Sequence, residues 1–213
     1  MANQHLKYKK NTYLKGVSIA VIRALSRARF SILAVGLTYL ISVSIGILMV
    51  QTGNQFAVSH RDRIVSQARS SPAIIALDRN DRFQAALLDF GGNLLGALSS
   101  TLSGLGVIAP FPIIAYRGWI GGIVSIDSLH GSRLMDPKEA LYYLTTLVLQ
   151  LIPYTLAGGI GVNLGLAYFR PKPYYQGGKW LGIPKEALRD IYWIYLLVVP
   201  LFLIASLWEF EMR

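Results

Sequence analysis

The chain has 213 residues, of which 53% are hydrophobic and only 15% charged, and its formal net charge is +10. Soluble domains carry roughly 25% charged residues, so this composition favours an integral membrane protein. The basic residues lie between apolar segments, where membrane topology places them, and we therefore expect no nucleic-acid partner. The absence of cysteine excludes a disulfide framework, a thiol nucleophile and cysteine-ligated metals.

Residues 1–30 predict a basic amphipathic segment on the cytoplasmic side. Residues 1–29 hold seven Lys/Arg and no acidic residue, and apolar residues recur at helical spacing between Tyr13 and Phe30. A helix of this kind lies along an anionic leaflet, so membrane lipid is an expected partner. The apolar positions are Leu14, Val17, Val21, Ile22 and Leu25.

Residues 31–213 predict a single all-α transmembrane domain, a polytopic bundle of about five helices. The twenty uncharged residues 31–50 are enough to cross a hydrocarbon core of about 30 Å. Residues 51–85 carry charges of both signs, which indicates an extracytoplasmic segment with short helices broken at Ser70-Ser71-Pro72. Asp136-Pro137 suits a helix start. The expected spans are about 31–50, 86–108, 111–128, 140–168 and 190–209.

Residues 89–127 are rich in glycine and proline but almost free of charge, with Arg117 the one charged residue between Asp89 and Asp127. Glycine and proline are tolerated in membrane helices because neighbouring helices approach closely. This stretch predicts two closely packed spans, or one span and a re-entrant half. Residues 141–169 are longer than one perpendicular span, so we expect tilt, protrusion or a kink at Pro153.

Lys and Arg counts favour five spans over four. Five spans place 13 of these residues on one side of the membrane and 8 on the other, whereas four spans give 11 and 10. The positive-inside rule favours the asymmetric arrangement. We therefore expect a plasma (inner) membrane protein with a cytoplasmic N-terminus and an external C-terminus.

Four polar residues are candidates for buried or partner contacts. Asn93 and Gln150 would hydrogen-bond between helices, and Glu209 at the end of the last span would contact a partner or mark the membrane boundary. Arg117 is the strongest functional candidate, because ionisable groups inside a membrane are rare and costly. An anionic lipid, Asp89 or Asp127, snorkelling or a substrate would each explain it. We expect close backbone packing at Gly118, Gly121, Gly122, Gly158, Gly159, Gly161 and Gly165.

The order of several motifs resembles that of the stage II sporulation protein M family of polytopic membrane proteins, over about residues 85–211. These are Asn93 in a small-residue span, residues 116–122 (YRGWIGG), residues 156–165 (LAGGIGVNLG) after Gln-Leu-Ile-Pro, and the closing residues 203–210 (LIASLWEF). The sequence departs from the family pattern at Arg117, where Asn is expected. It also lacks the family's His-Gly and Glu before Pro153.

The resemblance implies a non-enzymatic scaffold or accessory subunit that binds other membrane or envelope proteins, and a homo-oligomer is a further expectation. The alternative is a permease-like or channel subunit, because broken helices build transporter sites. We expect no cofactor and no metal. Ser103 has no histidine in the later spans to act as its base, and a solvated role for the lone His60 is favoured over a metal or catalytic one.

Overall fold

The computed structural model describes residues 2–126, 136–170, 173, 175 and 177–211, with the backbone alone for residues 2–14. The predicted loop around His130, and Asp127, lie outside the described residues. The described residues form seven α-helices, a one-turn 3-10 helix and one small hairpin. They are α1 (Ala2–Gln51), α2 (Gln55–Arg69), α3 (Pro72–Asp78), α4 (Arg82–Ser103), η1 (Gly104–Gly106), α5 (Pro110–Val124), α6 (Pro137–Phe169), β1 (Lys179–Trp180), β2 (Ile183–Pro184) and α7 (Lys185–Glu211).

The prediction of an all-helical chain is confirmed except for the β1–β2 hairpin. Its strands pair antiparallel through Lys179 with Pro184 and Trp180 with Ile183. Leu181 and Gly182 connect them with φ angles of 49° and 82°. Two successive positive φ angles are typical of a type I′ turn, which suits a two-residue hairpin. The sequence analysis missed this turn because a leucine occupies its first position.

Among the residues that the structure describes, three helices are long and apolar enough to cross a membrane: Lys15–Gln51 of α1, the whole of α6 and the whole of α7. They correspond to the predicted spans 31–50, 140–168 and 190–209. The predicted spans 86–108 and 111–128 are helical as α4 and α5 but do not reach this standard of length and hydropathy. At 1.5 Å per residue, the 15 residues of α5 extend about 22 Å, which is shorter than a hydrocarbon core.

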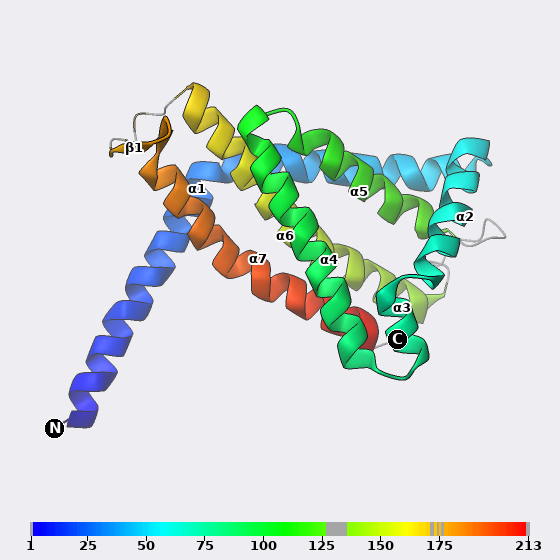
Figure 1. The fold of residues 1–213 in the computed structure, drawn as a ribbon, viewed down its shortest axis with the longest axis horizontal. Helices are drawn as coiled ribbons and strands as arrows, with labels where there is room; N and C mark the ends of the chain where they lie inside the picture. The colour runs from blue at the N-terminus through cyan, green and yellow to red at the C-terminus, as the bar shows by residue number, and fades with distance from the viewer. Residues whose placement is uncertain (1, 127–135, 171–172, 174, 176, 212–213) are drawn as a thin grey trace.

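The long helices run alternately in opposite directions between the two ends of the bundle (Figure 1). α1 and α5 lie side by side in the same direction, since Tyr39 lies against Gly118 and Val43 against Gly122. α4 and α7 are antiparallel, since Arg82 donates to the carbonyl of Glu211 at 2.9 Å while Thr101 pairs with the hydroxyl of Tyr195. α1, α5 and α7 therefore run one way, and α4 and α6 return.

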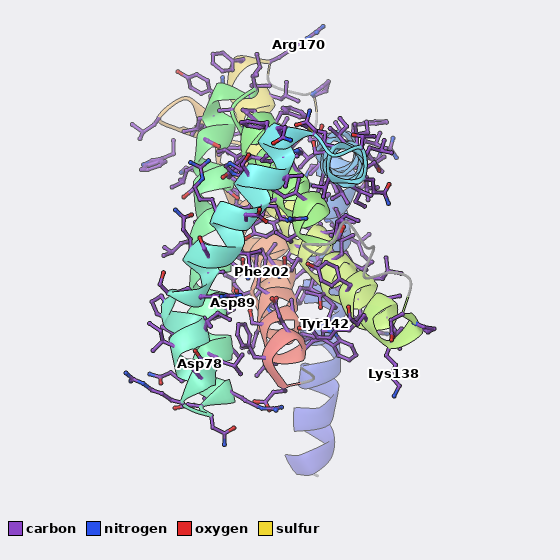
Figure 2. All side chains as sticks on the ribbon, turned by 90° about the vertical axis from the view of Figure 1, so that its right-hand side faces the viewer. Asp78, Asp89, Lys138, Tyr142, Arg170 and Phe202 are labelled. Carbon is purple, nitrogen blue, oxygen red and sulfur yellow. The ribbon has the colours of Figure 1, made fainter. Side chains whose placement is uncertain are left out.

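The two ends of the bundle differ in what covers them. We call the end that carries α2 and α3 the platform end, and the end that carries Arg27, Phe169 and the β1–β2 hairpin the basic end. Lys138 and Arg170, at opposite ends of α6, mark these two ends in Figure 2. The C-terminal end of α7 lies beside α3 at the platform end (Figure 1).

Side-chain caps at the platform end explain where four helices begin. Asn54, Ser71, Asp81 and Asp136 each accept a hydrogen bond from a backbone N–H of the helix that follows. The predicted break at Ser70-Ser71-Pro72 is confirmed, because α2 ends at Arg69 and α3 begins at Pro72. The predicted start at Asp136-Pro137 is also confirmed, with Asp136 Oδ1 2.7 Å from the amide of Lys138.

Residues 2–51 form one uninterrupted helix, so the expected division near residue 30 between an amphipathic segment and the first span falls inside α1. Ala24 and Ala28 are fully buried against the bundle, while Ile22 on the predicted apolar stripe is 63% exposed. The N-terminal part of α1 projects away from the other helices (Figure 1).

Glycines allow α5 to approach the backbone of α1. A Cβ added at Gly118 would lie 2.6 Å from the carbonyl oxygen of Tyr39, and one added at Gly122 would collide with the carbonyl of Val43. Gly121 is different, because its added Cβ would meet only a Leu147 methyl at 3.4 Å and the Tyr39 hydroxyl at 3.7 Å. Backbone approach, which we expected at all three positions, thus occurs at Gly118 and Gly122 but not at Gly121.

The glycines of α6 serve two crossings. A Cβ at Gly159 would lie 2.5 Å from Cα of Ile32 in α1, and one at Gly161 would lie 2.7 Å from the carbonyl oxygen of Thr101 in α4. Gly165 faces the carbonyl of Gly104, and Gly158 faces the side chain of Val35 at 3.0 Å. α6 is therefore the central helix, held against α1 on one side and α4 on the other.

Candidate functional site

A cavity of about 180 Å³ lies between α1, α5, α6 and α7. Three of the four polar candidates from the sequence contribute to its lining, namely Arg117, Gln150 and Glu209. The remaining lining residues are Tyr39, Ile120, Gly121, Val124, Tyr142, Tyr143, Thr146, Leu147 and Tyr154.

Arg117 is at the centre of α5 and its side chain is exposed. Its guanidinium carbon lies 5.3 Å from the centre of the Tyr154 ring, a cation–π contact. A Cβ added at Gly96 would lie only 2.6 Å from Nη2 of Arg117, so the absence of a side chain at Gly96 makes room for the guanidinium. Arg117 makes no hydrogen bond or ion pair with any described residue, Asp89 included.

Asn93 connects three helices through a buried polar chain. Its side-chain amide donates to Asp89 at 2.8 Å within α4, and its Oδ1 accepts from the Tyr154 hydroxyl of α6 at 2.7 Å. Ser206 of α7 donates to the same Asp89 oxygen at 2.6 Å. Phe202 of α7, one helical turn before Ser206, meets the ring of Tyr154 edge-on at 4.8 Å. These hydrogen bonds therefore fix the position of Tyr154, whose ring contacts the guanidinium of Arg117.

Gln150 and Glu209 join α6 to α7 at the other side of the cavity. Nε2 of Gln150 donates to Oε2 of Glu209 at 2.8 Å, and the hydroxyl of Tyr142 donates to the backbone carbonyl of Glu209 at 2.8 Å. Gln150 thus hydrogen-bonds across helices, as does Asn93. The carboxylate of Glu209 faces the cavity that Arg117 lines, so the cavity holds one cation and one anion on different helices.

Several residues of the site escaped the sequence analysis. Tyr39 and Tyr154 lie within long apolar stretches and were not singled out, and Ser206 appeared only as part of the closing residues 203–210. Only the pairing of helices brings their hydroxyls to one place. The four tyrosines of the lining were nevertheless a usable signal, because a buried tyrosine hydroxyl needs a hydrogen-bond partner.

Ser103 and His60, which the sequence analysis weighed for a catalytic or metal role, do not line this cavity. The Ser103 hydroxyl donates to the carbonyl of Ser100 at 2.9 Å, a local helix contact. His60 lies on α2 among aromatic rings, 5.0 Å from the ring of Trp119, at the platform end rather than in the cavity. Within the described part of the chain, no group of three or more His, Asp or Glu side chains could hold a metal ion.

Comparisons with known proteins found no family model, no curated protein and no solved structure that matches this chain.

Proposed function

We propose that the protein is a plasma (inner) membrane protein that crosses the bilayer five times, with its basic end in the cytoplasm. Three helices with the length and hydropathy of spans support this proposal. The alternating directions of α1, α4, α5, α6 and α7 are those of a chain that crosses the membrane five times, which places its two ends on opposite sides. Because α5 is shorter than the hydrocarbon core, the non-helical backbone at its ends would lie at membrane depth. Neighbouring helices would have to cover that backbone, since non-helical backbone is tolerated there only where protein buries it.

Its proposed role is that of a non-enzymatic scaffold or accessory subunit of a membrane protein assembly, as the resemblance to the stage II sporulation protein M family implies. The observation that carries the role is the platform formed by α2 and α3. These helices are fixed to the bundle rather than looped out from it. Such a surface is preorganised, so a partner would bind it without the cost of ordering a loop.

Both platform helices are anchored by buried contacts. In α2, Ala57 packs with Val50, Ile123 and Ile126, and Phe56 stacks on Trp119 at 5.7 Å. In α3, Ala76 packs with Ala85, Ala86 and Phe210. The outward faces carry exposed side chains of mixed character, which suit a protein surface better than lipid. They include Asp62, Arg63, Val65, Arg69, Ile75, Asp78 and Arg79.

Partner capture tests this role. The tagged protein, purified in mild detergent at native expression, is expected to bring one membrane or envelope protein in stoichiometric amount. Because Val65 and Arg69 are exposed on α2, the variant Val65→Asp/Arg69→Glu should lower the captured partner at least tenfold without unfolding the bundle. Arg170→Glu is the matched control, since Arg170 is exposed at the basic end. Full capture by the platform variant would contradict the proposed surface.

A permease-like subunit is the second candidate, favoured by the cavity and by the unpaired cation of Arg117 that faces it. Intramembrane cations of this kind mark substrate pathways in many transporters. The same purification separates the two functions. A protein that emerges alone as a homo-oligomer, and retains a small anion that Arg117→Gln releases, would replace the scaffold by the transport function.

A further inference from the structure

A second pocket lies between α1 and α7 at the basic end, far along both helices from the Arg117 cavity. Its volume is about 210 Å³, and five residues line it: Ala20, Arg23, Arg27, Arg189 and Trp193. Three of the five are arginines. A concentration of three guanidinium groups around one hollow is electrostatically unfavourable unless an anion neutralises it, and arginine is the preferred partner of phosphate.

The position of Arg27 is fixed by a buried carboxylate. Nε of Arg27 donates to Oδ2 of Asp190 at 2.7 Å, and Nη2 donates to Oδ1, a two-point contact with a residue whose side chain is fully buried. Tyr175 donates to Asp190 at 3.2 Å and accepts from Asn163 at 2.8 Å. This chain of contacts holds Arg27 in one orientation at the pocket wall and uses up the negative charge of Asp190.

Arg23 and Arg189 are left without a neutralising partner. Both are exposed, and neither makes a hydrogen bond or ion pair with the described residues. Arg23 lies one helical turn before Arg27, so the two like charges repel each other along α1. An anion in the pocket would remove this repulsion and would meet guanidinium groups from two different helices.

The surface beside the pocket is apolar. Ile19 and Ile22 precede Arg23 on α1 and are 49% and 63% exposed, and Trp193 forms the wall on α7. An arginine-lined hollow next to apolar side chains and a tryptophan is the pattern of a membrane interface, where the headgroup and the acyl chain of one lipid meet different surfaces. A free phosphate ion would use the arginines but not the apolar neighbours.

We propose that this pocket binds the phosphate of an anionic phospholipid, with the acyl chains along Ile19, Ile22 and Trp193. The proposal rests on the membrane location given above, and within it assigns a lipid site to the cytoplasmic leaflet. Bound lipid would join α1 to α7 at the point where the N-terminal part of α1 leaves the bundle.

Thermal unfolding of the purified full chain in detergent tests the proposal. Dioctanoyl phosphatidylglycerol is expected to raise the unfolding temperature in a saturable way, because a ligand that binds only the folded state stabilises it. Dioctanoyl phosphatidylcholine and inorganic phosphate should have no comparable effect. Arg23→Gln/Arg189→Gln should weaken the phosphatidylglycerol response at least tenfold, since each basic residue near an anionic surface contributes substantially. Arg69→Gln/Arg170→Gln, two exposed arginines that do not line the pocket and lie at opposite ends of the bundle, is the matched control.

Each alternative outcome overturns a stated part of the proposal. An equal response of the double pocket variant and the control would place the lipid elsewhere. An equal effect of inorganic phosphate would make the pocket a phosphate site rather than a lipid site, and an equal effect of phosphatidylcholine would show that the arginines do not select charge. None of these results would alter partner capture through the platform, so failure of the lipid site is distinguishable from failure of the proposed function.

Discussion

Gly122→Ala is expected to break the α1–α5 crossing, although it adds a single methyl group. The new Cβ would collide with the carbonyl of Val43 and lie 3.1 Å from Cα of Gly46. Both obstacles are backbone, so relief requires the two helices to separate along their length. Overpacking of a side-chain core costs about 1–3 kcal/mol, and backbone obstacles should reach or exceed the upper end. In lipid, helix association depends on such packing because apolar burial does not drive it.

Gly92→Ala is the matched control for that experiment. Gly92 lies in the middle of α4, and a Cβ there would meet nothing within 4 Å. Alanine favours a helix over glycine by roughly 0.5–1 kcal/mol, so this variant should be as stable as the parent or slightly more so. The measurement is the midpoint of heat-induced loss of helical circular dichroism in detergent. Equal midpoints for Gly122→Ala and Gly92→Ala would rule out the close crossing.

The second large effect is expected at Arg27. Arg27→Met leaves the fully buried carboxylate of Asp190 without its two-point cation partner, and breaking a buried pair in this way costs about 3–5 kcal/mol. The double variant Arg27→Met/Asp190→Leu also removes the buried carboxylate. It should recover much of the lost stability, because a well-packed apolar pair is often as stable as a buried ion pair.

A double-mutant cycle over Arg27 and Asp190 measures this coupling. Detergent unfolding midpoints of the parent, both single variants and the double variant provide the four corners. Arg29→Met serves as the control, since Arg29 is exposed on the same helix and its guanidinium lies over Phe30 at 4.7 Å. Additive effects of the two substitutions would mean that the pair contributes nothing to the fold.

Helix positions followed from local signals in the sequence. Asp136-Pro137 and Ser70-Ser71-Pro72 mark helix boundaries because a cap and a proline act on the residues next to them. Uncharged length similarly located α6 and α7. The amphipathic segment could not be separated from the first span, since nothing in residues 25–31 stops a helix and α1 runs through.

The site depends on pairings that no local signal specifies. Asn93, Gln150 and Glu209 stood out as polar residues in apolar stretches, yet each has a partner on another helix. Asn93 of α4 accepts from Tyr154 of α6, and Gln150 of α6 donates to Glu209 of α7. The parallel arrangement of α1 and α5 decides which side of α5 faces the bundle. For that reason Gly121, which the spacing grouped with Gly118 and Gly122, lines the cavity instead of a helix crossing.

Thiol labelling tests most directly the claim of five crossings with the platform outside. The chain has no cysteine, so each single-cysteine variant carries one thiol. Ser66→Cys lies on α2, Glu211→Cys at the end of α7 and Lys179→Cys in β1, all at exposed positions. A membrane-impermeant maleimide added to intact cells should label Ser66→Cys and Glu211→Cys, and should label Lys179→Cys only after lysis. Labelling of Lys179→Cys in intact cells, with Glu211→Cys protected, would indicate four crossings and contradict this account.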